Sequence, residues 1–208
     1  RDGTGGFWCG NLNGQFGVVR VSTITGNTIW SHLPTSGYCM GVGIAYVYAV
    51  AGWATWVVEP DDARSAVMRK ILGDAAQGGA KRGKLSAQQV AQVEQGIVRV
   101  AAVADLPAGL DLVVESVPER LALKQQVLAQ VAAVDPRVIA TNTSALSVNE
   151  LAGSVRDATR FLGMHFFNPV WSLPMVEIIR GDRTSEASLA LAREFAESTG
   201  KTTITVRD

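Results

Sequence analysis

His165 and Glu177 are the two side chains in this sequence best suited to acid–base chemistry. They lie twelve residues apart in the stretch "MHFFNPVWSLPMVEII", and His165 is one of only two histidines among the 208 residues. A neutral imidazole takes up a proton near pH 7. A carboxylate bound to its other ring nitrogen fixes the tautomer and stabilises the imidazolium that forms. We therefore interpret His165 as a general base and Glu177 as its partner.

The apolar residues around Glu177 support this pairing. Val176 and Ile178 flank the carboxylate in a pattern typical of a buried strand, and burying an unpaired carboxylate is unfavourable. The alternative is that Glu177 lies on an edge strand and reaches water, while His165 is an ordinary core histidine. On these two residues alone, that alternative is favoured.

A turn for binding a dinucleotide is the second candidate site, in "TSGYCMGVG" at residues 35–43. Gly41 fits the last glycine of a GxGxxG fingerprint, where a helix packs closely on a strand. Counting back from it puts Tyr38 at the middle glycine position, or Gly37 if Cys39 is an extra residue. The fingerprint is incomplete in either register, and a tyrosine near a pyrophosphate would be a steric problem.

Glu59 strengthens the dinucleotide hypothesis. It follows Gly41 by 18 residues and ends a predicted strand. An acid about 20 residues after the glycine turn accepts hydrogen bonds from the adenosine ribose and selects NAD over its 2′-phosphorylated form. The alternative is that Glu59 caps a helix that begins at Pro60. The surrounding alternation of strands and helices favours the ribose interpretation.

The elements that must position these residues alternate regularly after about residue 30. Residues 1–30 are rich in Gly, Asn and Thr and show no long periodic element. Hydrophobic periodicity, capping boxes and glycine stops predict helices over 40–51, from 60 to the glycines at 78–79, from 86, over 119–133, from 147 and over 184–199. They predict strands over 53–59, 110–117, 137–144, 160–167, 175–180 and 202–206.

This alternation predicts the fold class. Strands that alternate with helices need crossover connections, which give an α/β, Rossmann-like doubly wound, mostly parallel sheet with helices on both faces. Ligands bind such sheets outside the carboxyl ends of the strands, where Glu59, Glu119, residues 142–144 and His165 are expected. We divide the chain into an atypical N-terminal segment, 1–30, and an NAD-binding Rossmann-like domain, 31–208.

Composition excludes several other classes of function. Basic and acidic residues number 19 each, so net charge gives no sign of nucleic acid or an anionic membrane as partner. Two cysteines do not suggest a disulfide framework, and no signal peptide is visible, which favours the cytoplasm. Residues 40–58 lack charge like a membrane span, but Gly52 and the absence of flanking basic clusters favour a helix followed by a strand.

Five stretches resemble the NAD-binding domain of the 3-hydroxyacyl-CoA dehydrogenase family. They are "MGVGIAYVYAVAG", "VVEP", "LDLVVESVPERLALK", "ATNTSALSV" and "MHFFNPVWSLPMVEIIRG", and their order and spacing fit the family. The last two are the most specific. The resemblance runs from about residue 40 to 208. It implies an oxidoreductase of fatty acid or related acyl-CoA metabolism, which oxidises the 3-hydroxyl of a 3-hydroxyacyl-CoA to a ketone and passes hydride to NAD.

The resemblance also implies roles for individual residues. His165 would be the general base on the substrate hydroxyl, Glu177 its paired carboxylate, and Ser144 a hydrogen-bond partner of the substrate oxygen. No metal is implied. The NAD-binding residues predicted from the resemblance and the glycine turn together are Gly37, Met40, Gly41, Glu59, Val117, Pro118, Glu119, Lys124, Asn142, Ser144 and Asn168.

Partners follow from the same resemblance. The basic run at 81–84, "KRGK", could meet CoA phosphates, although a solvated turn between helices is slightly favoured. In the family, a separate helical domain follows the cofactor domain, makes the contact of a homodimer, covers the substrate and supplies an asparagine. The 208 residues do not include that domain, so the homodimer is an expectation for full-length members of the family.

Two functions therefore remain open. The first is a 3-hydroxyacyl-CoA dehydrogenase present as its cofactor domain, which the identities of His165 and Glu177 favour. The second is a non-catalytic nucleotide-binding remnant of the same family, which the incomplete glycine turn favours. A hydroxyacid dehydrogenase of another family is a third possibility, and it would use a catalytic lysine on a helix instead.

Overall fold

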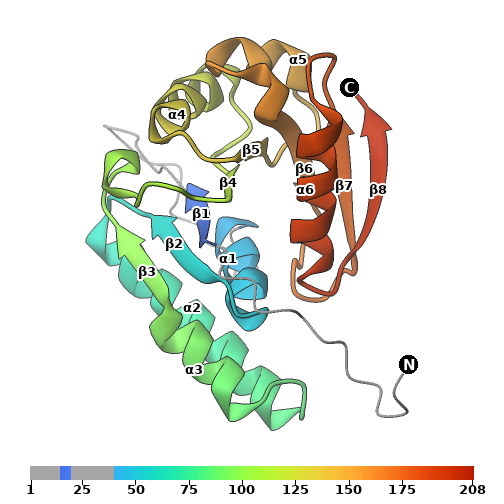
Figure 1. Cartoon of the computed structure of the whole chain (residues 1–208). Helices are drawn as coiled ribbons and strands as arrows, with labels where there is room; N and C mark the ends of the chain where they lie inside the picture. The colour runs from blue at the N-terminus through green and yellow to red at the C-terminus, as the bar shows by residue number, and fades with distance from the viewer. Residues whose placement is uncertain (1–14, 20–39) are drawn as a thin grey trace.

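The computed structural model describes residues 15–19 and 40–208, and these contain an eight-stranded sheet flanked by helices (Figure 1). The strand order is β3-β2-β1-β4-β5-β6-β7-β8. Every neighbouring pair is parallel except β6 and β7, which are antiparallel. The strands are β1 (Gln15–Val19), β2 (Ala54–Val58), β3 (Ile97–Val100), β4 (Leu112–Glu115), β5 (Val138–Thr141), β6 (Phe161–Phe166), β7 (Met175–Arg180) and β8 (Thr202–Arg207).

Local sequence signals mark the starts of α2 and α3 and the end of α1. Asp61 accepts a hydrogen bond from the backbone N–H of Arg64 at the start of α2, and Ser86 and Gln89 form a reciprocal capping box at the start of α3. Gly52 adopts a positive φ of 92° just after α1. The helices are α1 (Met40–Val50), α2 (Asp62–Lys81), α3 (Ala87–Gly96), α4 (Leu121–Val134), α5 (Val148–Leu151) and α6 (Glu186–Glu197).

Two separate hydrophobic clusters cover the two faces of the sheet. Alternation along β4 shows the division, because Leu112 and Val114 join one cluster while Val113 joins the other. The first cluster contains residues of α1, α2, α3 and α6, and the second contains residues of α4 and α5. In Figure 1 the α2–α3 hairpin extends away from the sheet, opposite α4 and α5. The doubly wound, mostly parallel fold is therefore confirmed.

The sequence prediction was wrong about strand β3 and about the end of helix α2. Strand β3 was missed, because its four residues follow directly on α3 and their apolar pattern merges with that of the helix. Helix α2 was expected to end at Gly78 and Gly79 but continues to Lys81. A Cβ on Gly79 would lie 2.9 Å from Leu85, so this glycine allows the close packing of α2 on the turn that follows it.

The start of the sheet also differs from the expectation. Strand β1 lies between β2 and β4, at the centre of the sheet, although its residues fall in the 1–30 segment that we set apart. The boundary that we predicted at residue 30 therefore separates β1 from the other strands of the sheet to which it belongs. The sequence "QFGVV" is short and contains a glycine, so it carries no periodic signal. Residues 20–39, which include Gly37 and the rest of the expected turn, lie outside the described residues.

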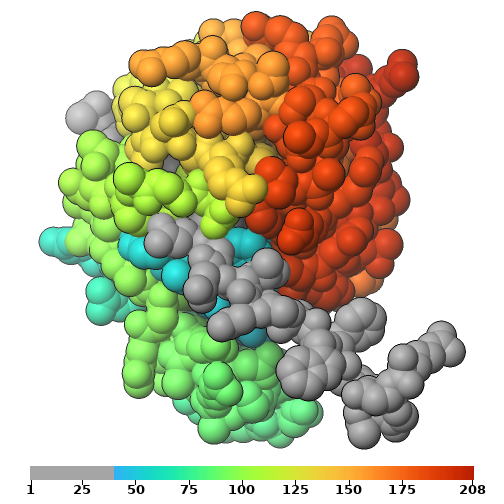
Figure 2. Space-filling model, in the orientation of Figure 1, coloured from blue at the N-terminus to red at the C-terminus, as the bar shows by residue number. Residues whose placement is uncertain are grey.

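The uncharged stretch at residues 40–58 forms two elements instead of one. It comprises α1, a turn at Gly52, and β2. Within 15–19 and 40–208, no helix is both long and apolar enough to cross a membrane. Figure 2 shows the C-terminal strands and α6 on one side of the molecule and the α2–α3 hairpin on the other.

Candidate active site

His165 and Glu177 face each other across two neighbouring strands. They are direct cross-strand partners in the antiparallel pairing of β6 with β7. The distance from His165 Nδ1 to Glu177 Oε2 is 2.7 Å. Because an ionised carboxylate only accepts hydrogen bonds, Nδ1 carries the proton and Nε2 is left as the basic nitrogen. The arrangement suits an imidazole that takes a proton at Nε2 while its orientation is fixed from the other side.

The edge-strand position that the alternative gave to Glu177 is wrong, although its side chain does reach water. Strand β7 pairs with β6 on one side and with β8 on the other, so it is not an edge strand. The two side chains are 20% and 28% exposed, respectively, which leaves the ring partly accessible to a substrate. Phe167 packs on the imidazole, with ring centroids 4.4 Å apart. The predicted contact is therefore present, while the catalytic roles remain predictions.

The loop after β5 carries the next group of predicted residues. The side-chain oxygen of Asn142 accepts a hydrogen bond from the backbone N–H of Phe166 at 3.0 Å, next to His165 in β6. Ser144 is exposed, and its backbone N–H donates to Glu119 Oε1 at 3.1 Å. The ends of β5 and β6 are thus tied together by an amide that we predicted to bind the cofactor.

Glu119 orders this loop from the end of the neighbouring strand. Its Oε1 accepts hydrogen bonds from the Thr143 hydroxyl and from the backbone N–H groups of Ser144 and Ala145. Partial burial works to raise the pKa of Glu119, but these hydrogen bonds and the charge of Lys124 outweigh it and hold the pKa below its usual value. The carboxylate is therefore a stable acceptor at neutral pH.

A buried ion pair beneath these loops was not predicted. Lys124 Nζ lies 3.0 Å from Glu115 Oε1, and both side chains are 0% exposed. Glu115 also accepts hydrogen bonds from the backbone N–H of Val117 and from the Thr141 hydroxyl, each at 2.6 Å. Burial raises the pKa of Glu115, and the lysine and these hydrogen bonds act against that rise. Glu115 ends an apolar run as Glu177 interrupts one, so the same argument could have found it.

The remaining predicted cofactor residues lie along the same edge of the sheet. Val117 is buried, Pro118 is exposed, and both follow β4. Asn168 is exposed in the β6–β7 loop and precedes a cis peptide bond to Pro169. Lys124 was expected along the cofactor, yet the structure places it inside the protein with carboxylate and carbonyl acceptors around it.

Glu59 occupies the carboxyl end of β2, as expected for an acid that binds a ribose. Its side chain is 0% exposed, and Oε1 accepts hydrogen bonds from the backbone N–H of Asp61 and from Nε of Arg64, both at 3.1 Å. Asp61, and not Glu59, is the N-cap of α2. Glu59 therefore contacts the first turn of the helix without being its cap, and the ribose role remains a prediction.

The start of α1 and the ends of β2 and β4 fit a dinucleotide. Strand order reverses between β1 and β4, and ligands of doubly wound sheets bind at that point. Met40 and Gly41 open α1, and a helix N-terminus attracts a pyrophosphate. A Cβ on Gly43 would lie 2.9 Å from Val170, so α1 approaches the β6–β7 loop closely. Among the described residues, no group of three metal-ligating side chains occurs.

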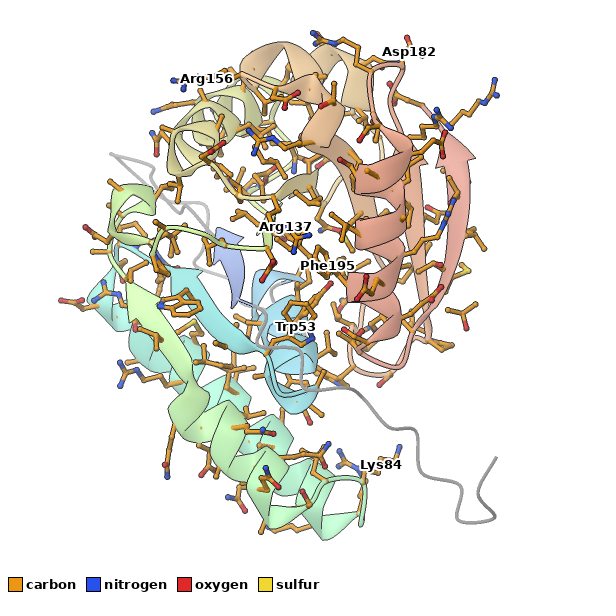
Figure 3. The ribbon with its side chains drawn as sticks, viewed as in Figure 1. Trp53, Lys84, Arg137, Arg156, Asp182 and Phe195 are labelled. Carbon is orange, nitrogen blue, oxygen red and sulfur yellow. The ribbon has the colours of Figure 1, made fainter. Side chains whose placement is uncertain are left out.

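The basic turn at 81–84 lies apart from this edge. It joins α2 to α3 at the end of the hairpin, where Figure 3 shows Lys84 pointing away from the sheet. The 20 residues of α2 span about 30 Å, at 1.5 Å for each residue. A contact of this turn with CoA phosphates remains a prediction.

Comparison with known proteins agrees with the sequence interpretation. The family model "3-hydroxyacyl-CoA dehydrogenase, NAD binding domain" matches residues 37–208. The chain is 37% identical, over 177 residues, to the fatty acid oxidation complex subunit alpha of Pseudomonas putida; the match covers 81% of this chain and 24% of that protein. The chain therefore spans about a quarter of the length of the curated relatives it matches.

Solved structures show the same similarity. (S)-3-hydroxybutyryl-CoA dehydrogenase from Ralstonia eutropha is 32% identical with a TM-score of 0.80, and the match covers 93% of this chain and 63% of that one. 3-Hydroxybutyryl-CoA dehydrogenase from Escherichia coli is 28% identical with a TM-score of 0.81, covering 94% of this chain and 39% of that one.

Proposed function

We propose a function from one premise: the chain belongs to the 3-hydroxyacyl-CoA dehydrogenase family, through its NAD-binding domain. The proposed reaction is the oxidation of the 3-hydroxyl of a 3-hydroxyacyl-CoA to the ketone. The observation that carries the proposal is the 2.7 Å hydrogen bond between His165 and Glu177. An imidazole oriented by a carboxylate is the group that proton removal from an alcohol needs.

The proton is handled by this chain's own residues. His165 Nε2 removes the hydroxyl proton of the substrate, and Glu177 stabilises the imidazolium at Nδ1. Ser144, exposed on the β5 loop, donates a hydrogen bond to the substrate oxygen. NAD, when bound, accepts hydride from C3 of the substrate. The base and the cofactor must both approach one carbon of the substrate, so the loops that carry them need fixed positions. Asn142 and Glu119 hold these loops by their hydrogen bonds to Phe166 and Ser144.

The acyl-CoA substrate is proposed from the similar proteins, two of which are named hydroxybutyryl-CoA dehydrogenases. We also propose that the protein dimerises through a helical domain that follows this one, as expected from the family. Thermal unfolding of the 208-residue chain with and without NAD tests the cofactor, and a turnover assay of the complete protein with acetoacetyl-CoA and NADH tests the substrate.

A second candidate function is a non-catalytic, nucleotide-binding or truncated remnant of the family, which keeps the fold and lacks the activity. It is favoured by the separation of β1 from α1: β1 ends at Val19 and α1 begins at Met40, whereas a dinucleotide-binding unit joins the two by a short glycine turn. Calorimetric NAD binding by a chain that does not oxidise NADH in the presence of acetoacetyl-CoA would support this candidate over the dehydrogenase.

His165→Gln is the variant that tests the proposed general base. We expect turnover to fall by a factor of about 10² to 10⁴, the usual contribution of a positioned base. The Kd for NAD should be nearly unchanged, because the substitution removes the base without removing a cofactor contact. Steady-state kinetics and calorimetry measure the two quantities. A parallel loss of NAD affinity and turnover would argue against the assigned role.

A further inference from the structure

We propose that Glu115 is a positioning residue, which acts through Lys124 to hold the loops after β4 and β5 in the geometry that the reaction needs. Neither side chain is exposed, so Glu115 reaches the substrate side of the sheet only through its neighbours. The inference rests on the proposed function for the chemistry that the loops perform. Its structural part, the ordering of the loops, is measurable without turnover.

Lys124 binds three acceptors that belong to three different segments. Its Nζ lies 3.0 Å from Glu115 Oε1 at the end of β4 and donates to the backbone carbonyl of Asn142, also at 3.0 Å, after β5. It lies 3.4 Å from Glu119 Oε2, just before α4. An ammonium group has three N–H donors; they donate to both oxygens of Glu115 and to the Asn142 carbonyl, and Glu119 is attracted by the charge. One buried cation thus fixes β4, the β5 loop and the entrance to α4 relative to one another.

The contacts continue from Lys124 to the candidate catalytic residues. Glu119, held by Lys124 on one oxygen, accepts the N–H groups of Ser144 and Ala145 on the other. Asn142, whose carbonyl is held by Lys124, accepts the N–H of Phe166 beside His165. Each link is a hydrogen bond or ion pair between groups within 3.4 Å. A shift of Lys124 would therefore displace the Ser144 loop and the end of β6 together.

A contribution to stability does not explain why Glu115 and Lys124 form a buried ion pair. Two charges taken out of water lose much of their hydration, and replacing a buried ion pair by neutral groups of similar volume is often neutral or stabilising. Removing one partner, in contrast, leaves a buried charge without compensation. This asymmetry makes it possible to separate a structural role from a positioning role with one double variant.

The test compares Glu115→Gln, Lys124→Met and the double variant Glu115→Gln/Lys124→Met in the complete protein that contains this domain. Glutamine keeps an acceptor for Val117 N–H, and methionine keeps the length of the lysine side chain. We expect the double variant to recover the thermal stability that Lys124→Met loses. We expect kcat of the double variant for NADH oxidation with acetoacetyl-CoA to remain up to about 100-fold below that of the wild type. A displacement of catalytic groups by about 1 Å has an effect of this size. KM should change little.

Hydrogen exchange provides the second readout. The backbone amides of Ser144, Ala145 and Phe166 are bonded to Glu119 and Asn142, so they should exchange faster in the double variant than in the wild type. Amides in the core of α3, which packs on α1, α2 and β3, should be unchanged. Unchanged exchange at all three amides would overturn the proposal, as would recovery of stability and turnover together.

Arg137→Met is the matched control. Arg137 forms an ion pair with Asp111 at the amino ends of the same two strands, far along the sheet from the loops. Its loss should leave kcat and the three amides unchanged. If the complete wild-type protein binds NAD but shows no turnover, the proposed dehydrogenase function fails, and the amide exchange of the variants still decides whether Glu115 and Lys124 position the loops.

Discussion

An ion pair lies at each end of strand β4, one with Arg137 at the start of β5 and one with Lys124 of α4, and the two pairs differ in character. At the amino ends, Arg137 and Asp111 are 2.7 Å apart with side chains 58% and 17% exposed; Figure 3 labels Arg137. At the carboxyl ends, Glu115 and Lys124 are 3.0 Å apart and fully buried. Exposed ion pairs contribute about 0–1 kcal/mol to stability, and buried ones lose hydration that their attraction does not always restore.

The difference in burial between the two pairs shows where polar side chains in this fold need a functional explanation. The amino-end pair is an ordinary surface contact. At the carboxyl ends of the strands, carboxylate, ammonium, hydroxyl and amide groups lie inside the protein and bind one another. A sheet of this kind binds its ligand at that edge, so the buried polar groups there are explained by the loops that they hold.

The largest change in stability is expected from Lys124→Met. It leaves the Glu115 carboxylate buried without its cation, a change that typically lowers the free energy of unfolding by about 3–5 kcal/mol. Chemical denaturation of both proteins measures the difference. A loss under about 1 kcal/mol would show that the buried pair of Glu115 and Lys124 contributes no more to stability than the exposed pair of Arg137 and Asp111.

Gly43→Ala should give the next largest effect. The new Cβ would lie 2.9 Å from Cβ and Cγ2 of Val170, so we expect overpacking to lower the free energy of unfolding by about 1–3 kcal/mol. Gly73→Ala in α2 is the control, since nothing lies within 4 Å of that Cβ. Alanine is favoured over glycine in a helix by about 1 kcal/mol, so this variant should be stabilised. Equal effects on denaturation midpoints would contradict the close approach of α1 to the β6–β7 loop.

Glu119→Gln should have a smaller effect that depends on pH. The folded-state pKa of Glu119 is below its ordinary value of 4.5. The carboxylate therefore stabilises the fold above that value, and the contribution disappears as pH falls through the folded-state pKa. We expect the melting temperature of the variant to lie roughly 2–4 °C below wild type at pH 7. The difference should begin to shrink as pH falls below about 4.5 and disappear once pH lies below the folded-state pKa. A constant difference would exclude the charge as its cause.

The smallest effect is expected from Arg137→Met. The guanidinium is more than half exposed, so its pairing with Asp111 should contribute no more than about 1 kcal/mol to the free energy of unfolding. Denaturation in low and high salt checks this, because an exposed pair is screened. A loss as large as that of Lys124→Met would mean that both ends of the strands depend equally on their ion pairs.

The sequence was sufficient for the parts of the molecule that depend on local patterns. Alternating periodicity predicted the doubly wound sheet, and an isolated carboxylate between Val176 and Ile178 predicted a partner, which the structure places at His165. The pairing of Glu115 with Lys124 was missed although the same reasoning applies to it. Lys124 had been assigned to the cofactor, and its burial becomes visible only when α4 packs on the sheet.

The start of the sheet could not be predicted for a physical reason. A central strand of a parallel sheet is stabilised by its neighbours on both sides, so it needs little local pattern of its own. Residues Gln15–Val19 pair with both β2 and β4 without any alternation in their sequence. Edge strand β3 lacked a signal for a different reason. It has four residues and follows directly on α3, so its apolar pattern cannot be separated from that of the helix.

The antiparallel turn between β6 and β7 has a consequence for the register of its strands. Strand β6 is held by β5 on its outer side and β7 by β8, so the alignment of His165 with Glu177 does not depend on the hairpin that connects them. The register that places the imidazole opposite its carboxylate is therefore a property of four neighbouring strands, and it is maintained by pairings on both sides of the segment that joins β6 to β7.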